Sequence, residues 1–336
     1  MSPEDAARAT EAILAADLRG AYTHGLGHVA WYVGMLMTGG VNPAGKPRVL
    51  KAGGSAIVVD GDNSLGHLAV SYGLDCALAQ AAVTGVAAVA VGGSNHCGAL
   101  GYYAARAASQ DMIALVATNA MPTMAPWGGL DRIVGINPIA IGIPARKLPP
   151  IVIDTSFGAV ARAKIVAYAN EGQLLPEGWA FDASGNPTTD PRTALEGLIA
   201  PIGDFKGVGL AIAFGILSTL LSGGAYGSQL GDLASGAKPG RDGQFVLALN
   251  IAFFEDLDKF KSRVDEIVDE IHHSRPADSV SHLFVPGEQA HERELRYRRE
   301  GIPVSDSTWR SLLDAAKRVG IETESLERAA VRSEGT

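Results

Sequence analysis

The sequence predicts an α/β protein. Between residues 55 and 165, short apolar segments that are typical of buried strands alternate with longer helical segments. The runs "VAAVAVGG", "MIALVATN" and "IVIDTS" are continuously apolar rather than alternating, as expected for strands in a sheet that is covered on both faces. The composition changes near residues 230 and 275, which favours a further lobe built from both ends of the chain.

Helices are predicted on either side of this core. In the first, Ser2 can cap the helix and Pro3 suits its first position. A second helix is predicted over 29–39 and stops at Gly39-Gly40. We therefore divide the chain into an N-terminal helical segment (1–50), an α/β domain (51–275) and a C-terminal helical segment (276–336) that packs with the N-terminal one.

The apolar segment 207–227 is the longest candidate for a membrane span. Glycines and hydroxyl residues interrupt it, and no uninterrupted apolar run reaches the roughly 18 residues that a span needs. We expect a buried core helix here. The N-terminus has no basic region followed by an apolar core, so no secretory signal is predicted.

Charge and cysteine content narrow the class of partner. The formal net charge of −8 and the pI of about 5.5 argue against a nucleic-acid surface, which normally shows a basic patch. A small anionic substrate is still compatible with an acidic protein. Two cysteines, Cys76 and Cys97, are too few for a disulfide framework. We expect a cytoplasmic protein with neither a membrane nor a nucleic-acid partner.

The stretch "VGGSNHCGALGYY" (91–103) places His96 at the end of a predicted strand, just before a helix. Open α/β sheets bind ligands at this edge, and imidazole can exchange a proton with a hydroxyl or carbonyl near neutral pH. Gly98 and Gly101 would let a substrate approach the backbone closely. Two interpretations stay open: His96 is catalytic, or Asn95 and His96 only complete a turn.

The glycines of this stretch do not fit the pattern G-x-G-x-x-G of a Rossmann dinucleotide site. An acidic residue about 20 positions further on, at a strand end, is also missing. A nicotinamide cofactor, if one binds, must therefore bind in another way.

His24 and His28 in "THGLGH" have the i, i+4 spacing of two zinc ligands on one helix face. No glutamate follows His24, Gly25 and Gly27 disfavour a helix, and no third ligand is evident. We therefore predict no metal site here. Two interpretations of this segment stay open: it contacts the substrate from a loop, or it only marks the start of the next helix.

Two further residues stand at ligand-facing positions. Asp154 ends a buried strand, where its carboxylate could accept a hydrogen bond from a ribose or an amide, or cap the following helix together with Thr155 or Ser156. Lys206 begins an apolar helix between mobile glycines, where it could bind a phosphate or a carboxylate, or remain a solvated cap.

Taken together, these segments resemble the malate/L-lactate dehydrogenase family of NAD(P)-dependent oxidoreductases, which is distinct from the Rossmann lactate and malate dehydrogenases. The family includes ureidoglycolate, sulfolactate and diketogulonate reductases and the piperideine- and pyrroline-2-carboxylate reductases. The matching segments cover nearly the whole chain in the family's order. They are "ADLRGAYTHG", "GSNHCGALGYYA", "TNAMPTMAPWGG", "GINPIAIGIP", "IVIDTSFGAVARAKI", "PEGWAFDASGNPTTDP", "GDFKGVGLAI", and "PGE" followed by "RREGIPV".

The resemblance implies a fold, a cofactor and an assembly. The fold would be a non-Rossmann, mixed-sheet dinucleotide-binding domain with a helical lobe built from both termini, so that the 51–275 domain binds the cofactor. NAD or NADP would be the cofactor, a small carboxylate the substrate, and a homodimer the assembly.

The resemblance also assigns roles to residues. His96 corresponds to the proton donor and acceptor in the family's S-N-H motif, and His24 to a histidine beside cofactor and substrate. His28, Tyr32 and Asn95 would contact the substrate. The cofactor would lie against a larger set: His24, Thr118, Asn119, Ala120, Asp154, Thr155, Ser156, Lys206, Pro286, Gly287 and Glu288.

Two departures from the family pattern bear on the substrate. His28 stands where the motif S-H-G-x-x-R has an arginine, and a guanidinium can hold a carboxylate with two hydrogen bonds whereas a neutral imidazole makes one. Cys97 stands where an aromatic residue is frequent, which we expect to open space in the pocket.

The implied reaction is hydride transfer between a nicotinamide and a 2-oxo or 2-hydroxy acid, with His96 exchanging the proton. The alternative within the family is reduction of a cyclic ketimine carboxylate. Outside it, a zinc hydrolase that uses His24 and His28, or a binding protein without turnover, also remains.

Overall fold

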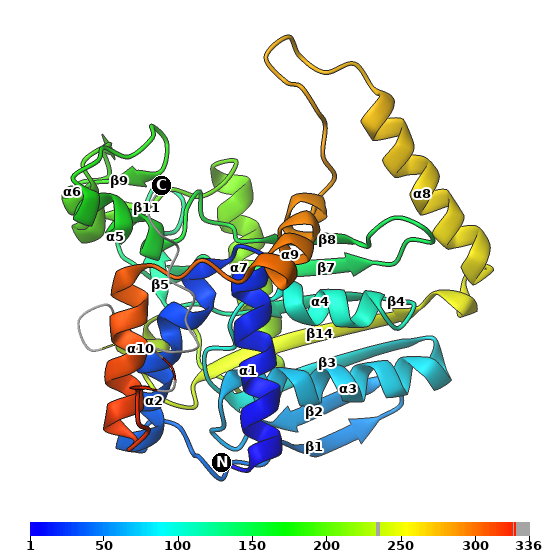
Figure 1. Cartoon of the computed structure of the whole chain (residues 1–336), viewed down its shortest axis with the longest axis horizontal. Coiled ribbons are helices and arrows are strands. Elements are labelled where there is room, and N and C mark those ends of the chain that lie inside the picture. The colour runs from blue at the N-terminus through cyan, green and yellow to red at the C-terminus, as the bar shows by residue number, and fades with distance from the viewer. Residues whose placement is uncertain (233–235, 325, 327–336) are drawn as a thin grey trace.

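A mixed seven-stranded sheet lies at the centre of the computed structural model, which describes residues 1–232, 236–324 and 326 (Figure 1). The strand order is β1-β2-β3-β14-β4-β7-β8. Strands β2 and β3 pair in parallel, and the other neighbours pair antiparallel. The strands are β1 (Arg48–Gly53), β2 (Ala56–Asp60), β3 (Val86–Ser94), β4 (Met112–Thr118), β7 (Ile139–Ile143), β8 (Ile151–Thr155) and β14 (Asp242–Asn250). The prediction of an α/β fold with a mixed sheet is confirmed.

Helices cover both faces of the sheet. On one face lie α3 (Gly66–Thr84) and α4 (Gly101–Ala108), and on the other lies α7 (Phe205–Thr219) with the short η3 (Leu220–Ser222). Two adjacent residues of β3 show this. The side chain of Val91 faces Gly73 of α3 on one face of the sheet, whereas Gly92 faces Ser222 of η3 on the other. Burial on both faces explains why the strand sequences are continuously apolar.

The helix α7 differs from its prediction. Together with η3 it is long and apolar enough to cross a membrane by length and composition, with a mean hydropathy of 1.7, yet only 33% of this segment is buried. Its inner face, where Val208 and Ala211 are buried, packs against the sheet and a smaller lobe, and Ala211 belongs to the core of that lobe. Its outer face leaves Leu210, Ile216 and Leu220 exposed. The segment is therefore a half-buried surface helix, and the expectation of a fully buried core helix is wrong.

The smaller lobe is built from segments on both sides of β7 and β8 in the chain and has its own apolar core, which includes Met124, Phe157 and Ile165. Phe157 stacks on Phe214 of α7, which joins the lobe to the main sheet. Its elements are β5 (Pro122–Met124), β6 (Val134–Gly135), α5 (Arg162–Glu171), β9 (Ala180–Phe181), β10 (Pro187–Thr188), α6 (Pro191–Glu196) and β11 (Leu198–Ile199). The remaining short elements are η4 (Gly227–Leu230), β12 (Gly231–Asp232), β13 (Gly236–Ala237) and η5 (Ile251–Phe253).

Helices from the two ends of the chain pack against each other. Helix α1 (Pro3–Leu18) contacts α9 (Glu288–Glu300), and α2 (Val29–Thr38) contacts α10 (Asp306–Arg318). An ion pair of 2.9 Å joins Arg19, just after α1, to Glu294 of α9. The domain boundaries given above stay a prediction.

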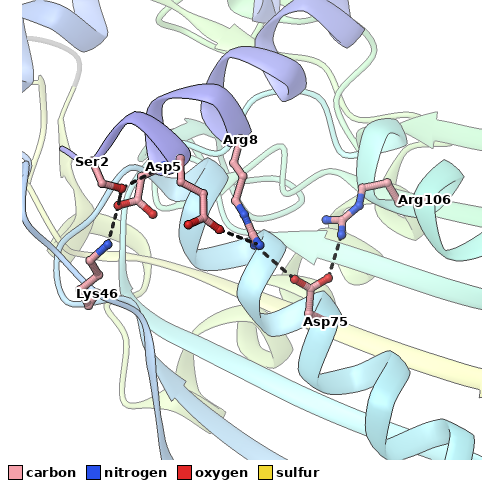
Figure 2. Close-up of polar contacts among 7 residues, drawn as sticks. Ser2, Asp5, Arg8, Lys46, Asp75 and Arg106 are labelled. Atoms are coloured by element: carbon pink, nitrogen blue, oxygen red, sulfur yellow. Dashed lines mark hydrogen bonds and ion pairs between the residues drawn. The ribbon is translucent and has the colours of Figure 1, made fainter.

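Charged side chains fasten α1 to the α/β body, as Figure 2 shows. Ser2 caps the helix as expected, since its hydroxyl accepts the N–H of Asp5. Asp75 of α3 lies between two cations, with Arg106 at 2.7 Å and Arg8 of α1 at 3.6 Å. These contacts fix the helix that leads into the first histidine motif.

Helix α8 (Leu257–His273) and the loop 274–287 stand away from the sheet (Figure 1). The carboxylate of Asp265 holds α8 by accepting the backbone N–H groups of Arg146 and Lys147. The loop then returns to α9, beside the end of α1.

Gly142 on β7 offers a test of this packing. A Cβ atom there would collide with the backbone of Ala104 on α4. We expect Gly142→Ala to lower the free energy of unfolding by about 1–3 kcal/mol, because the helix must move off the strand. Denaturant titration measures this.

The matched control is Gly209→Ala on α7, where an added Cβ meets nothing within 4 Å. There the change should raise stability by about 0.5–1 kcal/mol, since alanine favours the helix. A Gly142→Ala protein as stable as the wild type would contradict the close approach of α4 and β7.

Candidate active site

Four histidines and a tyrosine from separate elements meet at one end of the sheet. His24 and His28 lie on two short 3-10 turns, η1 (Tyr22–His24) and η2 (Leu26–His28), and His96 follows β3. His67 lies on α3 and Tyr32 on α2. We call His24, His28, His67 and His96 the histidine cluster.

Three of the imidazole rings are nearly parallel. The ring centre of His96 is 5.6 Å from that of His24 and 5.3 Å from that of His28, with interplanar angles of 18° and 11°. Trp31 meets His28 and His96 edge-on. The two motifs "THGLGH" and "SNHCG", which are more than sixty residues apart, therefore form one site.

Asp17 determines the path of the loop that carries His24 and His28. Its carboxylate, only 4% exposed, accepts the backbone N–H of Leu26. Gly25 has to lack a side chain, because the Asp17 carboxylate occupies the space that a Cβ would need. Burial raises the pKa of Asp17, and the Leu26 N–H opposes that rise.

Tyr32 orients His96. Its phenolic oxygen lies 2.7 Å from Nδ1 of His96. Beneath Tyr32 the ring of His67 packs edge-on at 5.0 Å, and neither nitrogen of His67 has a hydrogen-bond partner. Gly98 has φ of 74°, and a Cβ there would lie 2.8 Å from Nε2 of His67.

The environment of the histidine cluster disfavours positive charge. Burial lowers the pKa of His24 to about 4, with repulsion from His28 adding to the effect. Burial lowers the pKa of His67 to about 3 and takes the pKa of His96 well below its usual value, and the neighbouring histidines add to both shifts. Burial also lowers the pKa of His28. Burial and mutual repulsion therefore favour the neutral form of all four rings.

A pocket of about 430 Å³ adjoins the cluster and is lined by one of its members, His24, and by Gly98. Asp154 lines it, and its carboxylate accepts the backbone N–H of Gly101 at 2.7 Å. Burial raises the pKa of Asp154, while that N–H and the Arg19 charge oppose the rise. Other lining residues include Ala15, Ala16, Thr23, Ala99, Thr155, Ser156, Gly287 and Ala290.

The pocket fits part of a nicotinamide nucleotide. Its volume is in the range of small-molecule sites, and about half of its lining residues are glycine or alanine, which allow a flat ring to approach closely. Thr155, Ser156 and Asp154 offer hydrogen-bonding groups, and Arg19 offers a charge for a phosphate.

Part of the predicted cofactor set lines this pocket, namely His24, Asp154, Thr155, Ser156 and Gly287. Pro286, beside Gly287, accepts the N–H of Val152 on β8 through its carbonyl. The carboxylate of Glu288 is instead 3.0 Å from His272. Lys206 is exposed at the start of α7 and is not among the pocket residues.

Other predicted residues connect loops at the strand ends. The amide of Asn95 donates to the carbonyl of Ser64 and accepts the N–H of Gly240. Asn119 likewise accepts the N–H of Gly243, and the hydroxyl of Thr118 donates to the Gly243 carbonyl. The N–H of Ala120 donates to Asn137. These contacts shape the site, and the proposed ligand contacts of these residues stay predictions.

Cys97 does not face the pocket, contrary to the expectation that it opens space there. It is 2% exposed and packs in the main core with Leu100 and Tyr103. Burial raises the pKa of its thiol to about 12. The small side chain therefore affects the core rather than the width of the pocket.

Sequence reasoning missed two residues of the site, Arg19 and His67. Arg19 lies in the quoted segment "ADLRGAYTHG", and a cation directly before a turn and the first histidine motif was a usable signal. His67 lies in the first turn of a mainly apolar helix, where a lone histidine gives little signal.

The sequence matches the malate/L-lactate dehydrogenase family over residues 1–313. The chain belongs to this family. It is 36% identical over 321 residues to the L-sulfolactate dehydrogenase of Methanocaldococcus jannaschii, covering 96% of this chain and 92% of that protein. The solved structure of sulfolactate dehydrogenase from that organism matches with a TM-score of 0.89. The predicted family is confirmed.

Two further similar proteins have names that state a different cofactor or a different substrate. A (2R)-3-sulfolactate dehydrogenase (NADP(+)) of Chromohalobacter salexigens is 38% identical over 247 residues, which cover 73% of this chain and 74% of that protein. The structure of Δ1-piperideine-2-carboxylate reductase from Pseudomonas syringae is 29% identical, with a TM-score of 0.84 and 94% coverage of both chains. A dehydrogenase or reductase is confirmed as the enzyme class.

The buried imidazoles should make stability depend on pH. An unfolded histidine titrates near 6.5 but His67 near 3, so between these values the unfolded chain binds more protons. The free energy of unfolding then falls as the pH falls, by about 1.4 kcal/mol per pH unit from this group. We expect His67→Gln to remove this part of the acid sensitivity.

Urea denaturation of wild type and His67→Gln at several pH values between 7 and 4 measures the two slopes. Equal slopes would show that His67 is protonated in the folded protein.

Proposed function

We propose that the protein is an NAD(P)-dependent dehydrogenase that interconverts a small 2-oxo acid and the corresponding 2-hydroxy acid, with His96 giving and taking the proton. Family membership supports the reaction class and the cofactor. The observation that carries the role of His96 is its hydrogen bond with Tyr32, which engages Nδ1, so that Nε2 is the nitrogen that would meet the substrate.

When bound, the nicotinamide supplies or accepts the hydride at the substrate carbon. In the oxidation direction, the neutral imidazole of His96 accepts the proton of the substrate hydroxyl through Nε2. The lowered pKa of His96 favours this neutral form. In reduction the ring must first gain a proton and then donate it to the developing alkoxide. His24, which stacks against His96 and lines the pocket, would orient substrate and cofactor.

The substrate carboxylate would lie beside His28. A neutral ring donates one hydrogen bond to a carboxylate, where an arginine would donate two. Arg19 is the one arginine or lysine among the described residues that line the pocket, and its charge is paired with Glu294. We therefore expect weaker anion binding at this site than an arginine would give.

Reduction of a cyclic ketimine carboxylate is the second candidate. The likeness to Δ1-piperideine-2-carboxylate reductase supports it, and His96 would then give its proton to the ring nitrogen. The two candidates place the same residues in the same roles and differ in the atom that is protonated.

A substrate panel tests the proposed reaction. Purified protein is mixed with NADH or NADPH and with pyruvate, oxaloacetate, sulfopyruvate, 2-oxoglutarate, piperideine-2-carboxylate or pyrroline-2-carboxylate, and the loss of reduced nicotinamide absorbance is followed. Turnover of a 2-oxo acid supports the main proposal, and turnover of a cyclic ketimine alone supports the second. If none reacts, His28→Arg tests whether the missing guanidinium is the cause.

His96→Ala should lower turnover by about 10²–10⁴-fold while cofactor affinity stays largely intact, because general acid–base catalysis contributes that much. Steady-state rates and fluorescence titration of the reduced cofactor separate the two effects. His273→Ala, on exposed α8, serves as a control that should keep full activity. A loss of less than tenfold would show that another group moves the proton.

We also propose that the enzyme is a cytoplasmic homodimer. Both cysteines are free, which suits a reducing compartment. The exposed apolar residues Leu210, Ile216 and Leu220 on the outer face of α7 form a surface that a second copy would cover. Light scattering should give twice the chain mass, and Leu210→Glu should shift the assembly toward the monomer. A wild-type mass of one chain would contradict the dimer.

A further inference from the structure

We propose that the loop between α8 and α9 carries a site for a divalent transition-metal ion of the zinc class, built from His272, His282 and Glu288. It is separate from the histidine cluster, and the proposal does not depend on the proposed reaction. Among the residues that the structure describes, it is the one group of three or more histidine, cysteine or acidic residues whose ligand atoms lie within 4.8 Å of one another.

The three side chains already face a common point. Nε2 of His272 lies 3.0 Å from Oε2 of Glu288, and the ring centre of His282 is 5.2 Å from that of His272. A tetrahedral zinc ion with bonds of about 2.0–2.1 Å holds its ligand atoms roughly 3.4 Å apart. The first pair has nearly that spacing, and rotation of the exposed His282 side chain closes the remainder.

The donor set selects the kind of ion. Magnesium and calcium prefer sites made of oxygen ligands, whereas two imidazoles with one carboxylate suit zinc and similar borderline ions. Three protein ligands leave a fourth position for water. The site therefore matches zinc in both ligand type and ligand number.

Surrounding contacts hold two of the ligands in place. The side chains of His272 and Glu288 are only 19% and 16% exposed. Oε2 of Glu288 also accepts the backbone N–H of Val285 at 3.1 Å, and the ring of His282 packs edge-on against Phe284 at 4.5 Å. Outer contacts of this kind orient ligands and strengthen metal binding.

The position of the site gives a bound ion a structural effect. It would join the last turn of α8, the middle of the loop 274–287 and the first turn of α9. Gly287 and Ala290, directly beside Glu288, line the pocket, and the carbonyl of Pro286 is bound to Val152 of β8. An ion would therefore fasten a protruding loop to one wall of the pocket.

The test is zinc titration of the full-length protein after treatment with a chelator. Competition with a chromophoric chelator measures affinity and stoichiometry, and the visible spectrum of the cobalt(II)-loaded protein reports nitrogen and oxygen ligands. The variants are His282→Ala, at an exposed position, and Glu288→Gln, which keeps the hydrogen bond from Val285. His273→Ala, one position along the same helix, is the matched control, and His24→Ala reports on the histidine cluster.

We expect the wild type to bind one zinc ion per chain, and His282→Ala and Glu288→Gln each to weaken binding at least about tenfold. His273→Ala and His24→Ala should bind as the wild type does. The proposal is overturned if the wild type binds no stoichiometric zinc, if His282→Ala and Glu288→Gln both keep full affinity, or if affinity is lost in His24→Ala instead. Circular dichroism of each variant confirms that the fold is retained.

Discussion

The burial of four imidazoles at the end of one sheet is the constraint on which the rest of the site depends. An imidazolium in this environment would lose its hydration and meet three neighbouring rings, and both effects favour the neutral form. A neutral ring needs a defined tautomer if it is to exchange a proton. In the tautomer that would take a proton at Nε2, the Nδ1–H of His96 donates to the hydroxyl oxygen of Tyr32. Stacking against His24 and His28 then restricts how the ring can turn.

This arrangement requires that distant parts of the chain be held to one another. His24 and His28 come from short turns with little structure of their own, and the buried Asp17 supplies the acceptor that shapes them. Asp17 is itself placed by α1, which ionic contacts tie to α3 and, through Arg19, to α9. The terminal helices therefore contribute to the active site and are not an appendage to the α/β domain.

Local sequence indicated much of this fold and some of the site. Continuous apolar runs identified the buried strands, and the rule that ligands bind at strand ends singled out His96 and Asp154. The insertion of β14 between β3 and β4 pairs segments more than a hundred residues apart, which no local pattern records. For α7, apolar composition alone does not tell a buried helix from one with an exposed apolar face.

Side-chain direction was the other quantity that the sequence could not supply. Gly287 and Glu288 are adjacent in one turn, yet the first lines the pocket and the second turns toward α8. A motif predicts where the backbone passes, whereas the rotamer depends on partners such as His272 that lie elsewhere in the chain.

The positive charge that the site can offer to a substrate anion depends on two features. One is His28, which stands where the family motif has an arginine, and the other is Arg19 beside the terminal helices. The cation Arg19 shares its charge with Glu294, and Asp154 is a buried carboxyl whose pKa is raised. With a neutral ring at His28, the cluster offers no full positive charge to a substrate anion. An arriving carboxylate would itself stabilise a proton on a neighbouring imidazole. In the proposed mechanism, substrate binding and protonation of His96 would therefore favour each other, so that the acid needed for reduction would form when the anion is present.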